Sequence, residues 1–164
     1  MTFENQQEII FNEIATLIND IIPTKWEKFN FHGESKEVEG GEVYFFYTLP
    51  NENGKLHYCY FIPDEFNVSR DIYDNLMLEL FGLLVKLQKV FKQNEQELWY
   101  SFSMFVDSEL KMDAIYDYVD WSTSEFGLSD RINYFQYKYL NVVFDDTDKQ
   151  QKMLAMETYE KSQN

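Results

Sequence analysis

The chain has 164 residues, of which 45% are apolar and 18% aromatic, and this composition excludes an intrinsically disordered protein. Its 29 acidic side chains against 14 Lys and Arg give a formal net charge of -15. Such a field repels nucleic acid and anionic lipid and attracts basic partners, so we expect neither direct nucleic-acid binding nor membrane binding. The charge alone leaves open a second interpretation, in which acidity only keeps the protein soluble.

Cys59 is the only cysteine, so no intrachain disulfide can form, as is typical of proteins from a reducing compartment. The first 22 residues contain no basic region followed by an apolar stretch, and no run of about 18 apolar residues occurs in the sequence. We therefore expect a cytoplasmic protein. Cys59 is interpreted as a small core residue within a strand.

The N-terminal third predicts one helix and three strands. Apolar side chains recur at helical spacing over residues 4–22, up to Pro23: Ile10, Ile14, Leu17, Ile18 and Ile21. Strand-like runs follow at 26–31, 42–49 and 55–62. They are divided by Gly40-Gly41, which we interpret as a turn, and by the turn-rich residues 50–54. These runs predict an antiparallel meander.

The centre of the chain predicts a long helix after Pro63, with Ser69 as its N-cap. One apolar stripe follows it: Ile72, Leu76, Leu80, Leu83, Leu84, Leu87 and Phe91. Its last turns carry Lys86, Lys89 and Lys92, which suit the negative end of a helix dipole, although they could also form a binding patch.

The last third predicts a hairpin and further helices. Residues 98–106 and 110–118 alternate in polarity around a turn near 107–109. Residues 122–125 have the pattern of a capping box, residues 131–139 are helix-like, and Thr147 or Gln150 could cap a final helix. We predict a single α+β domain over residues 1–164, with an antiparallel sheet of about five strands packed with an N-terminal helix, a long central helix and C-terminal helices.

The sequence offers little for catalysis, and we expect no cofactor, no metal and no enzyme activity. His32 and His57 lie 25 positions apart without a cysteine at ligand spacing, and no phosphate-binding loop or nucleophile elbow is present. The side chains of His57 and Cys59 would diverge about 7 Å apart on one strand face. Asp113 and Asp117 would lie about 13 Å apart on one strand, farther than the roughly 5 to 9.5 Å of paired catalytic carboxylates. A metal-dependent phosphoesterase that uses these carboxylates is the alternative.

Negative charge is concentrated between residues 107 and 130, where Lys111 is the sole base. The acids of this acidic segment are Asp107, Glu109, Asp113, Asp117, Asp120, Glu125 and Asp130, so it carries six net negative charges. Large aromatics lie close in sequence: Tyr116, Tyr118, Trp121, Tyr134 and Tyr137. Acids beside aromatics could steer and anchor a basic protein partner. The structural alternative is that Trp121 and most of the tyrosines belong to the core.

The segment from Asp117 to Gly127, DYVDWSTSEFG, together with the downstream residues Arg131, Asn133, Tyr134, Tyr137 and Lys138, resembles YezG/EsaG-type immunity proteins. Upstream pieces agree in order: Ile22-Pro23 with Trp26-Glu27-Lys28, Gly40-Gly41-Glu42-Val43 with Tyr47-Thr48, and Ile62-Pro63 with Asn67 and Ser69. The resemblance covers roughly residues 1–140. Tyr139, Leu140 and Asn141 depart from the family pattern, and residues 141–164 match weakly.

The resemblance implies an α+β antitoxin without enzyme activity. Such a protein would bind and neutralise a toxin, often a nuclease with a basic catalytic domain, that the producing cell exports through a type VII-like secretion system. The candidate toxin-binding residues are Asp113, Asp117, Asp120, Trp121, Glu125, Tyr134 and Tyr137. A third alternative is an acidic interaction protein unrelated to toxins.

Overall fold

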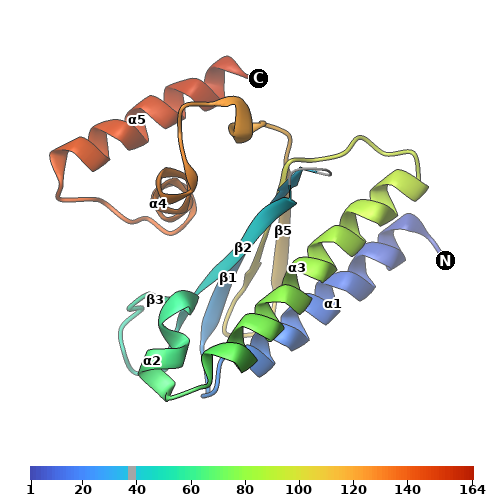
Figure 1. Cartoon of the computed structure of the whole chain (residues 1–164), viewed down its shortest axis with the longest axis vertical. Coiled ribbons are helices and arrows are strands. Elements are labelled where there is room, and N and C mark those ends of the chain that lie inside the picture. Colours follow the sequence, from blue (N-terminus) through green and yellow to red (C-terminus); the bar gives the residue numbers. More distant parts are fainter. Residues whose placement is uncertain (37–39) are drawn as a thin grey trace. The chain divides into compact units, whose positions relative to one another are not determined.

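The computed structural model describes residues 1–36 and 40–164, which form an α+β fold with a five-stranded antiparallel sheet, as predicted (Figure 1). The chain divides into two compact units, Met1–Asp117 and Tyr118–Asn164. The first unit contains α1 (Phe3–Ile21), β1 (Lys28–Lys36), β2 (Gly40–Thr48), β3 (His57–Tyr58), the 3-10 turn η1 (Cys59–Phe61), α2 (Ile62–Phe66), α3 (Arg70–Gln93), β4 (Ser101–Val106) and β5 (Met112–Asp117). The second unit contains the 3-10 turn η2 (Trp121–Thr123), α4 (Leu128–Tyr139) and α5 (Thr147–Ser162).

The sheet has the strand order β3-β2-β1-β4-β5, so β1 is its central strand and β5 one of its edges. In β1, Phe31 pairs with Phe45 of β2 on one side and with Met104 of β4 on the other. The strand continues five residues beyond the predicted end at Phe31. Its second half, HGESK, is polar and shows no apolar alternation, but all of it pairs with β2 and its first three residues also pair with β4.

Gly40-Gly41, which we predicted as a turn, instead begins β2. A Cβ atom at Gly41 would lie 1.9 Å from the backbone oxygen of Glu34 in the paired strand. Glycine is therefore required there by a close approach of two backbones. Residues 37–39, which precede this pair, lie outside the described residues.

Helices α1 and α3 cover one face of the sheet and run antiparallel to each other (Figure 1). Lys86 of α3 bonds Glu13 of α1, and Asn94 just after α3 bonds Gln6. The core between the helices and the sheet is almost completely buried: Ile10, Ile14, Ile18, Phe29, Phe31, Phe45, Tyr47, Leu80, Leu84, Leu87, Phe102 and Met104. The sheet approaches α3 closely at Gly33, where a Cβ atom would meet the Leu84 side chain at 2.7 Å.

The predicted apolar stripe of α3 is correct except at its start. The Ser69 side chain accepts a hydrogen bond from the Ile72 backbone N–H, which confirms the N-cap. Ile72 itself is 58% exposed, and Tyr73 is the buried residue of that turn. The prediction counted aliphatic side chains, and tyrosine is not one of them. It therefore placed the start of the stripe at Ile72, one residue before the buried Tyr73.

The predicted strand at 55–62 is wrong over most of its length. Only His57 and Tyr58 pair with β2, and the chain then turns into η1 and α2. The backbone N–H of Phe45, which would serve a longer β3, points instead at Cys59 Sγ at 3.4 Å. Pro63 lies in the first turn of α2, where its missing N–H costs nothing. A short apolar run cannot distinguish a strand from a buried helical turn by periodicity.

The second unit begins differently from the prediction. Residues 122–125 do not cap a helix, because η2 ends at Thr123 and α4 begins only at Leu128. Gly127 is the N-cap residue of α4, and its backbone N–H donates a hydrogen bond to the Asp130 carboxylate at 3.1 Å. The helix predicted at 131–139 lies within α4.

The final helix was predicted correctly, but its cap was not. Asp146 caps α5, since its side chain accepts a hydrogen bond from the Lys149 N–H at 3.0 Å. Thr147 is the first residue of the helix, and Gln150 accepts a bond from the Phe144 N–H.

Candidate functional site

Asp107 organises the β4–β5 hairpin, at the turn that the sequence predicted. One of its carboxylate oxygens accepts hydrogen bonds from the backbone N–H groups of Glu109 and Lys111, at 2.9 and 3.0 Å. Leu110 within the turn has a φ of 64°. Asp107 therefore has a structural task, while the Glu109 side chain is exposed and makes no polar contact with any described residue.

Asp113 and Asp117 lie on the same face of β5, two strand repeats apart. Asp113 pairs in register with Phe105, and Asp117 pairs with Ser101. Asp113 is exposed and its carboxylate makes no ion pair or hydrogen bond with the described residues, whereas Asp117 is half-buried and has partners.

The acids of the second unit divide in the same way. Asp120 accepts a hydrogen bond from the Ser122 N–H at 2.9 Å and so caps η2. Asp130 caps α4 and lies 3.3 Å from the Lys152 ammonium. Glu125 is exposed and, within residues 1–36 and 40–164, has no polar partner.

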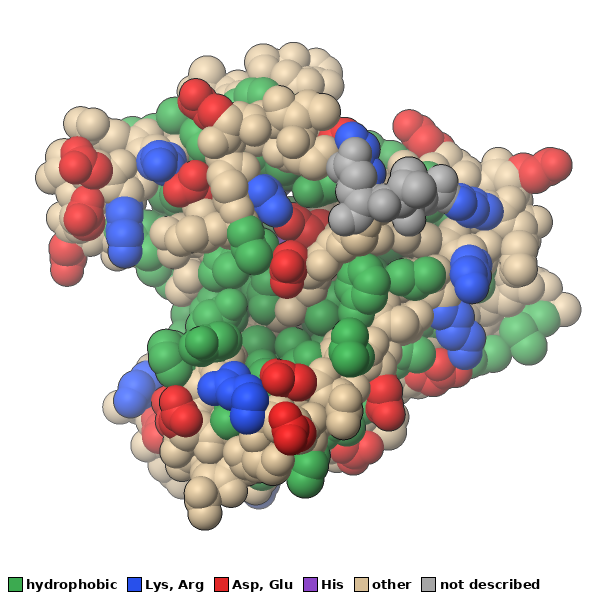
Figure 2. All heavy atoms as spheres, viewed as in Figure 1, with side chains coloured by type: hydrophobic (Ala, Val, Ile, Leu, Met, Phe, Trp, Pro, Cys, Tyr) green, Lys and Arg blue, Asp and Glu red, His purple; other side chains and the backbone are tan. Residues whose placement is uncertain are grey.

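Apart from the half-buried Asp117, the acidic segment therefore contains two kinds of carboxylate. Asp107, Asp120 and Asp130 hold turns and helix ends, and Glu109, Asp113 and Glu125 are exposed without a partner among the described residues. Sequence reasoning could not separate the two groups, although Asp preceding a turn or helix is itself the signal of a cap. In the view of Figure 2, acidic side chains are dispersed over the surface with basic ones between them.

Trp121 forms the centre of an aromatic cluster in the second unit. Its ring lies 5.1 Å from Tyr159, 5.4 Å from Tyr134 and 6.0 Å from Phe126, measured between centroids. The side chain is only 6% exposed. Trp121 therefore belongs to the core of this unit, which was the structural alternative. Most of its atoms are inaccessible to a partner.

Tyr134 is buried to the same extent and its hydroxyl donates a hydrogen bond to Glu160 Oε1 at 3.0 Å. Burial first, and then the Glu160 carboxylate, raise the pKa of this phenol above its usual range. Glu160 also binds Lys138 at 2.7 Å. Tyr137 stacks on Tyr134 at 6.0 Å but remains half-buried, and the two tyrosines line a hollow of about 450 Å³ on this unit. Among the candidate aromatic residues, Tyr137 presents the most surface.

The histidines and the cysteine take part in local structure. His57 stacks on Tyr47 and binds Glu52 at 2.6 Å. Cys59 is buried, which raises the pKa of its thiol to about 11 and keeps the thiol protonated and unreactive at neutral pH. Within the described part of the chain, no three His, Cys, Asp or Glu side chains are grouped so that they could hold a metal ion.

Ser103, His32 and Glu34 form a polar row across β4 and β1 that the sequence did not reveal. Ser103 Oγ lies 2.8 Å from His32 Nδ1, and His32 Nε2 lies 3.7 Å from Glu34 Oε2. The second separation exceeds hydrogen-bond range. Ser103 and Glu34 are each at most 4% exposed, so the hydroxyl presents no surface to a substrate. We interpret the row as packing of buried polar groups.

Sequence comparison identifies the class of this protein. The YezG-like immunity protein family ("Immunity protein YezG-like") matches residues 7–154, and the chain belongs to this family. The match extends beyond the roughly 140 residues over which we recognised the resemblance, into α5.

Individual relatives show the same relationship over nearly the whole chain. The chain is 35% identical to the type VII secretion system protein EsaG of Staphylococcus aureus (strain NCTC 8325 / PS 47), over 97% of this chain and 96% of that protein. It is 34% identical to immunity protein YezG of Bacillus spizizenii (strain ATCC 23059 / NRRL B-14472 / W23), over 82% of each. Identity to immunity protein YezG of Bacillus subtilis (strain 168) is 29%, over 89% of this chain and 95% of the relative. An immunity role follows from the family.

No helix in the described ranges 1–36 and 40–164 has the length and apolar character needed to cross a membrane.

Proposed function

We propose that this chain is a cytoplasmic antitoxin that binds a cognate secreted nuclease toxin and neutralises it stoichiometrically, without catalytic turnover. Membership of the YezG-like immunity family carries the proposal. The net charge of -15 supports a basic partner, because nucleases present cationic surfaces to nucleic acid.

The toxin-facing acids that we propose are the exposed ones of the acidic segment, which lie in the first unit at Glu109 and Asp113 and in the second unit at Glu125. Glu109, Asp113 and Glu125 have no competing partner in the described structure, so their charges are free to act on an approaching cation. At 0.15 M salt the Debye length is about 8 Å, and long-range attraction acts mainly on the association rate. The half-buried Tyr137 supplies aromatic surface of the second unit for short-range contact, while the buried Trp121 and Tyr134 support the fold of that unit.

Neutralisation is tested by co-expression with each secreted, nuclease-like toxin that is encoded beside the gene for this chain. We expect growth to be rescued, and the two proteins to co-purify at fixed stoichiometry. Neighbouring toxins that are neither bound nor neutralised would contradict the proposal. A chain that binds another protein in cells lacking the toxin would favour the interaction protein unrelated to toxins.

The acidic surface is tested with the variant Glu109→Gln, Asp113→Asn and Glu125→Gln. Its matched control removes three exposed acids elsewhere: Asp74→Asn, Glu97→Gln and Asp145→Asn. We expect the first variant to associate with the toxin more slowly, about tenfold at 50 mM salt and less at 500 mM, and the control to change little. Equal rates for the two variants would show that only the net charge matters. These substitutions leave the caps at Asp107, Asp120 and Asp130 intact.

The absence of turnover is tested by calorimetry with Mg²⁺ and Zn²⁺ and by phosphoester hydrolysis assays. We expect neither saturable micromolar binding nor hydrolysis. Hydrolysis that tracks metal binding and is lost in Asp113→Asn would establish the phosphoesterase alternative.

A further inference from the structure

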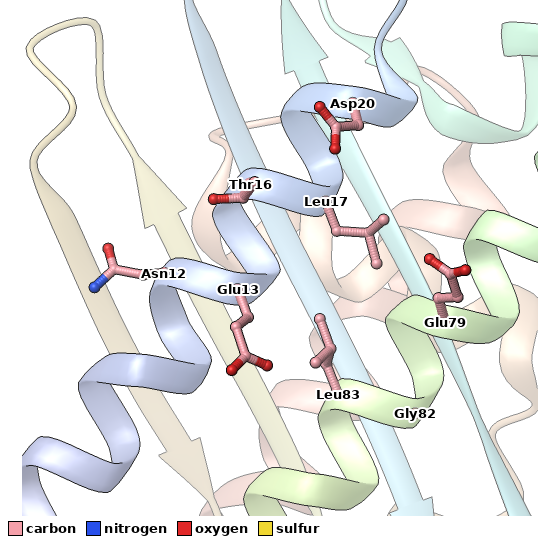
Figure 3. A pocket seen from close by; sticks show the side chains of 8 residues that line it. All are labelled: Asn12, Glu13, Thr16, Leu17, Asp20, Glu79, Gly82 and Leu83. Atoms are coloured by element: carbon pink, nitrogen blue, oxygen red, sulfur yellow. The ribbon is translucent and has the colours of Figure 1, made fainter.

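A shallow groove runs between α1 and α3 on the surface they turn away from the sheet, with a volume of about 630 Å³ (Figure 3). Figure 3 shows Leu17 of α1 and Leu83 of α3 pointing toward one another across it, with Gly82 beside Leu83. Asp20 and Glu79 lie on the two helices toward the same end of the groove (Figure 3). The groove therefore combines an apolar floor with two carboxylates at one end, while the third carboxylate that lines it, Glu13, pairs with Lys86.

The pairing of the two helices places like charges opposite each other. Glu13 and Lys86 form an ion pair at 3.0 Å, and the helices run antiparallel. Seven residues farther along α1 and seven residues back along α3, the same register brings Asp20 opposite Glu79. Neither carboxylate makes an ion pair or hydrogen bond with any described residue, and both are exposed.

Two residues of the groove are unfavourable for the fold itself. Gly82 lies in the interior of α3, where glycine is a poor helix former, and a Cβ atom there would meet nothing within 4 Å. No contact within the chain explains the glycine, but its lack of a side chain keeps the groove hollow. Asp20 lies in the last turn of α1, where a negative charge opposes the helix dipole and no basic residue offsets it.

We propose that this groove docks a cationic amphipathic helix of the toxin, a proposal that rests on the neutralising function proposed above. An aliphatic side chain of that helix packs over Gly82 between Leu17 and Leu83, and a Lys or Arg one turn away lies between Asp20 and Glu79. Apolar anchors at helical spacing in a groove are a recurrent mode of helix recognition. A cation placed between two facing carboxylates removes their mutual repulsion as well as gaining its own attraction.

The charge of the groove favours this occupant over others. A second copy of this chain would bring another molecule of net charge -15, and a symmetric contact would place Asp20 and Glu79 against their own equivalents. An anionic lipid surface would be repelled by the same carboxylates.

The test compares groove variants with matched controls for binding to the catalytically inactivated nuclease domain of the toxin encoded beside the gene. Gly82→Leu fills the groove with a good helix former, and Gly82→Ala is its control, since one methyl group leaves most of the groove open. Asp20→Lys with Glu79→Lys reverses the charge at the groove end. Its control, Asp74→Lys with Glu97→Lys, makes the same change in net charge at exposed sites away from the groove. Thermal melts establish that each variant is folded.

We expect Gly82→Leu and the Asp20/Glu79 reversal each to weaken binding about tenfold or more, and both controls to stay within about threefold of wild type. The methyl NMR signals of Leu17 and Leu83 should shift when the inactivated domain is added to the wild-type chain. The same shifts on concentrating the chain alone, with a dimer in sedimentation, would overturn the proposal in favour of self-association.

Binding of the toxin by the wild-type chain tests the proposed function, and binding by the groove variants tests the docking site separately. If the wild-type chain binds the toxin and the folded groove variants bind equally well, only the groove proposal is overturned. If the wild-type chain binds no neighbouring toxin, the neutralising function and this docking site fall together.

Discussion

The two compact units of the molecule achieve burial by different means. In the first unit, the strands contribute Phe and Tyr side chains that pack against Ile and Leu side chains of α1 and α3. The backbone N–H and C=O groups there are hydrogen-bonded between neighbouring strands of the sheet. Residues 118–164, all described, contain no strand. Their aromatic rings lie around Trp121, and Met153 and Met156 are buried. A unit of this size buries a smaller fraction of its surface, so each large side chain carries a greater share of its stability.

The largest effect should come from Trp121→Ala. Removing a buried indole leaves a cavity between Phe126, Tyr134 and Tyr159, and we expect the free energy of unfolding of the second unit to fall by about 3 to 5 kcal/mol. Denaturant titration followed by NMR signals from both units measures this. Trp26→Ala, at a half-buried indole, is the control and should cost less.

The same experiment tests the prediction that residues 1–164 form one domain. If the first unit keeps its signals while the second is lost, the two units fold separately. Simultaneous loss of both at one denaturant concentration would mean that the chain unfolds as a single cooperative domain.

In the first unit, Gly33→Ala should damage the contact between sheet and helix. The added methyl group would lie 2.7 Å from a Leu84 methyl group, too close unless the Leu84 side chain moves. We expect a loss of about 1 to 3 kcal/mol in the free energy of unfolding. Leu84→Ala alone should cost about 2 to 5 kcal/mol because Leu84 is fully buried. In that background Gly33→Ala should cost less than it does in the wild-type chain, because truncating Leu84 makes room. A loss for Gly33→Ala that is unchanged by the second substitution would show that the clash is not its cause.

A third prediction concerns alkaline pH and Cys59. Burial raises the pKa of its thiol to about 11, against about 8.5 in an unfolded chain. Because the folded pKa is the higher one, this stability is fully present below pH 8.5 and is lost as pH rises through 11. Between pH 8.5 and 9.5, where tyrosines in the unfolded chain are still mostly protonated, we expect a decrease that steepens from about 0.7 to about 1.2 kcal/mol per pH unit. The variant Cys59→Ala should show a flatter profile, and parallel profiles would contradict the assignment to Cys59.

The smallest effect, and one of opposite sign, is expected for Gly82→Ala. The position is an exposed helix interior with open space around it, so alanine should raise the free energy of unfolding by about 0.5 to 1 kcal/mol. Thermal melts measure the change. Destabilisation would mean that Gly82 has a structural task in α3, and that its presence needs no ligand to explain it.

Sequence patterns located α1, α3, β2, β4, β5 and most of α4 because these elements repeat an apolar face with the period of a helix or a strand. The pattern failed where tertiary contacts replaced it. The polar half of β1 is strand because all of it pairs with β2 and its first three residues, His32 to Glu34, also pair with β4. Cys59 lies in η1, where its sulfur accepts the Phe45 N–H in place of a longer β3.

The sequence by itself determined the fold class, the family resemblance and the strong negative charge, since all of these depend on residue type and order along the chain. Only the tertiary structure decided which of those residues remain available for contact. In the folded chain Trp121 is buried, and the Asp120 and Asp130 carboxylates accept hydrogen bonds from backbone N–H groups. Asp113 remains exposed. Asp20 and Glu79 lie on opposite sides of one groove, although 58 residues lie between them in the sequence. Burial and juxtaposition depend on which surfaces pack together in space, and no local pattern records that.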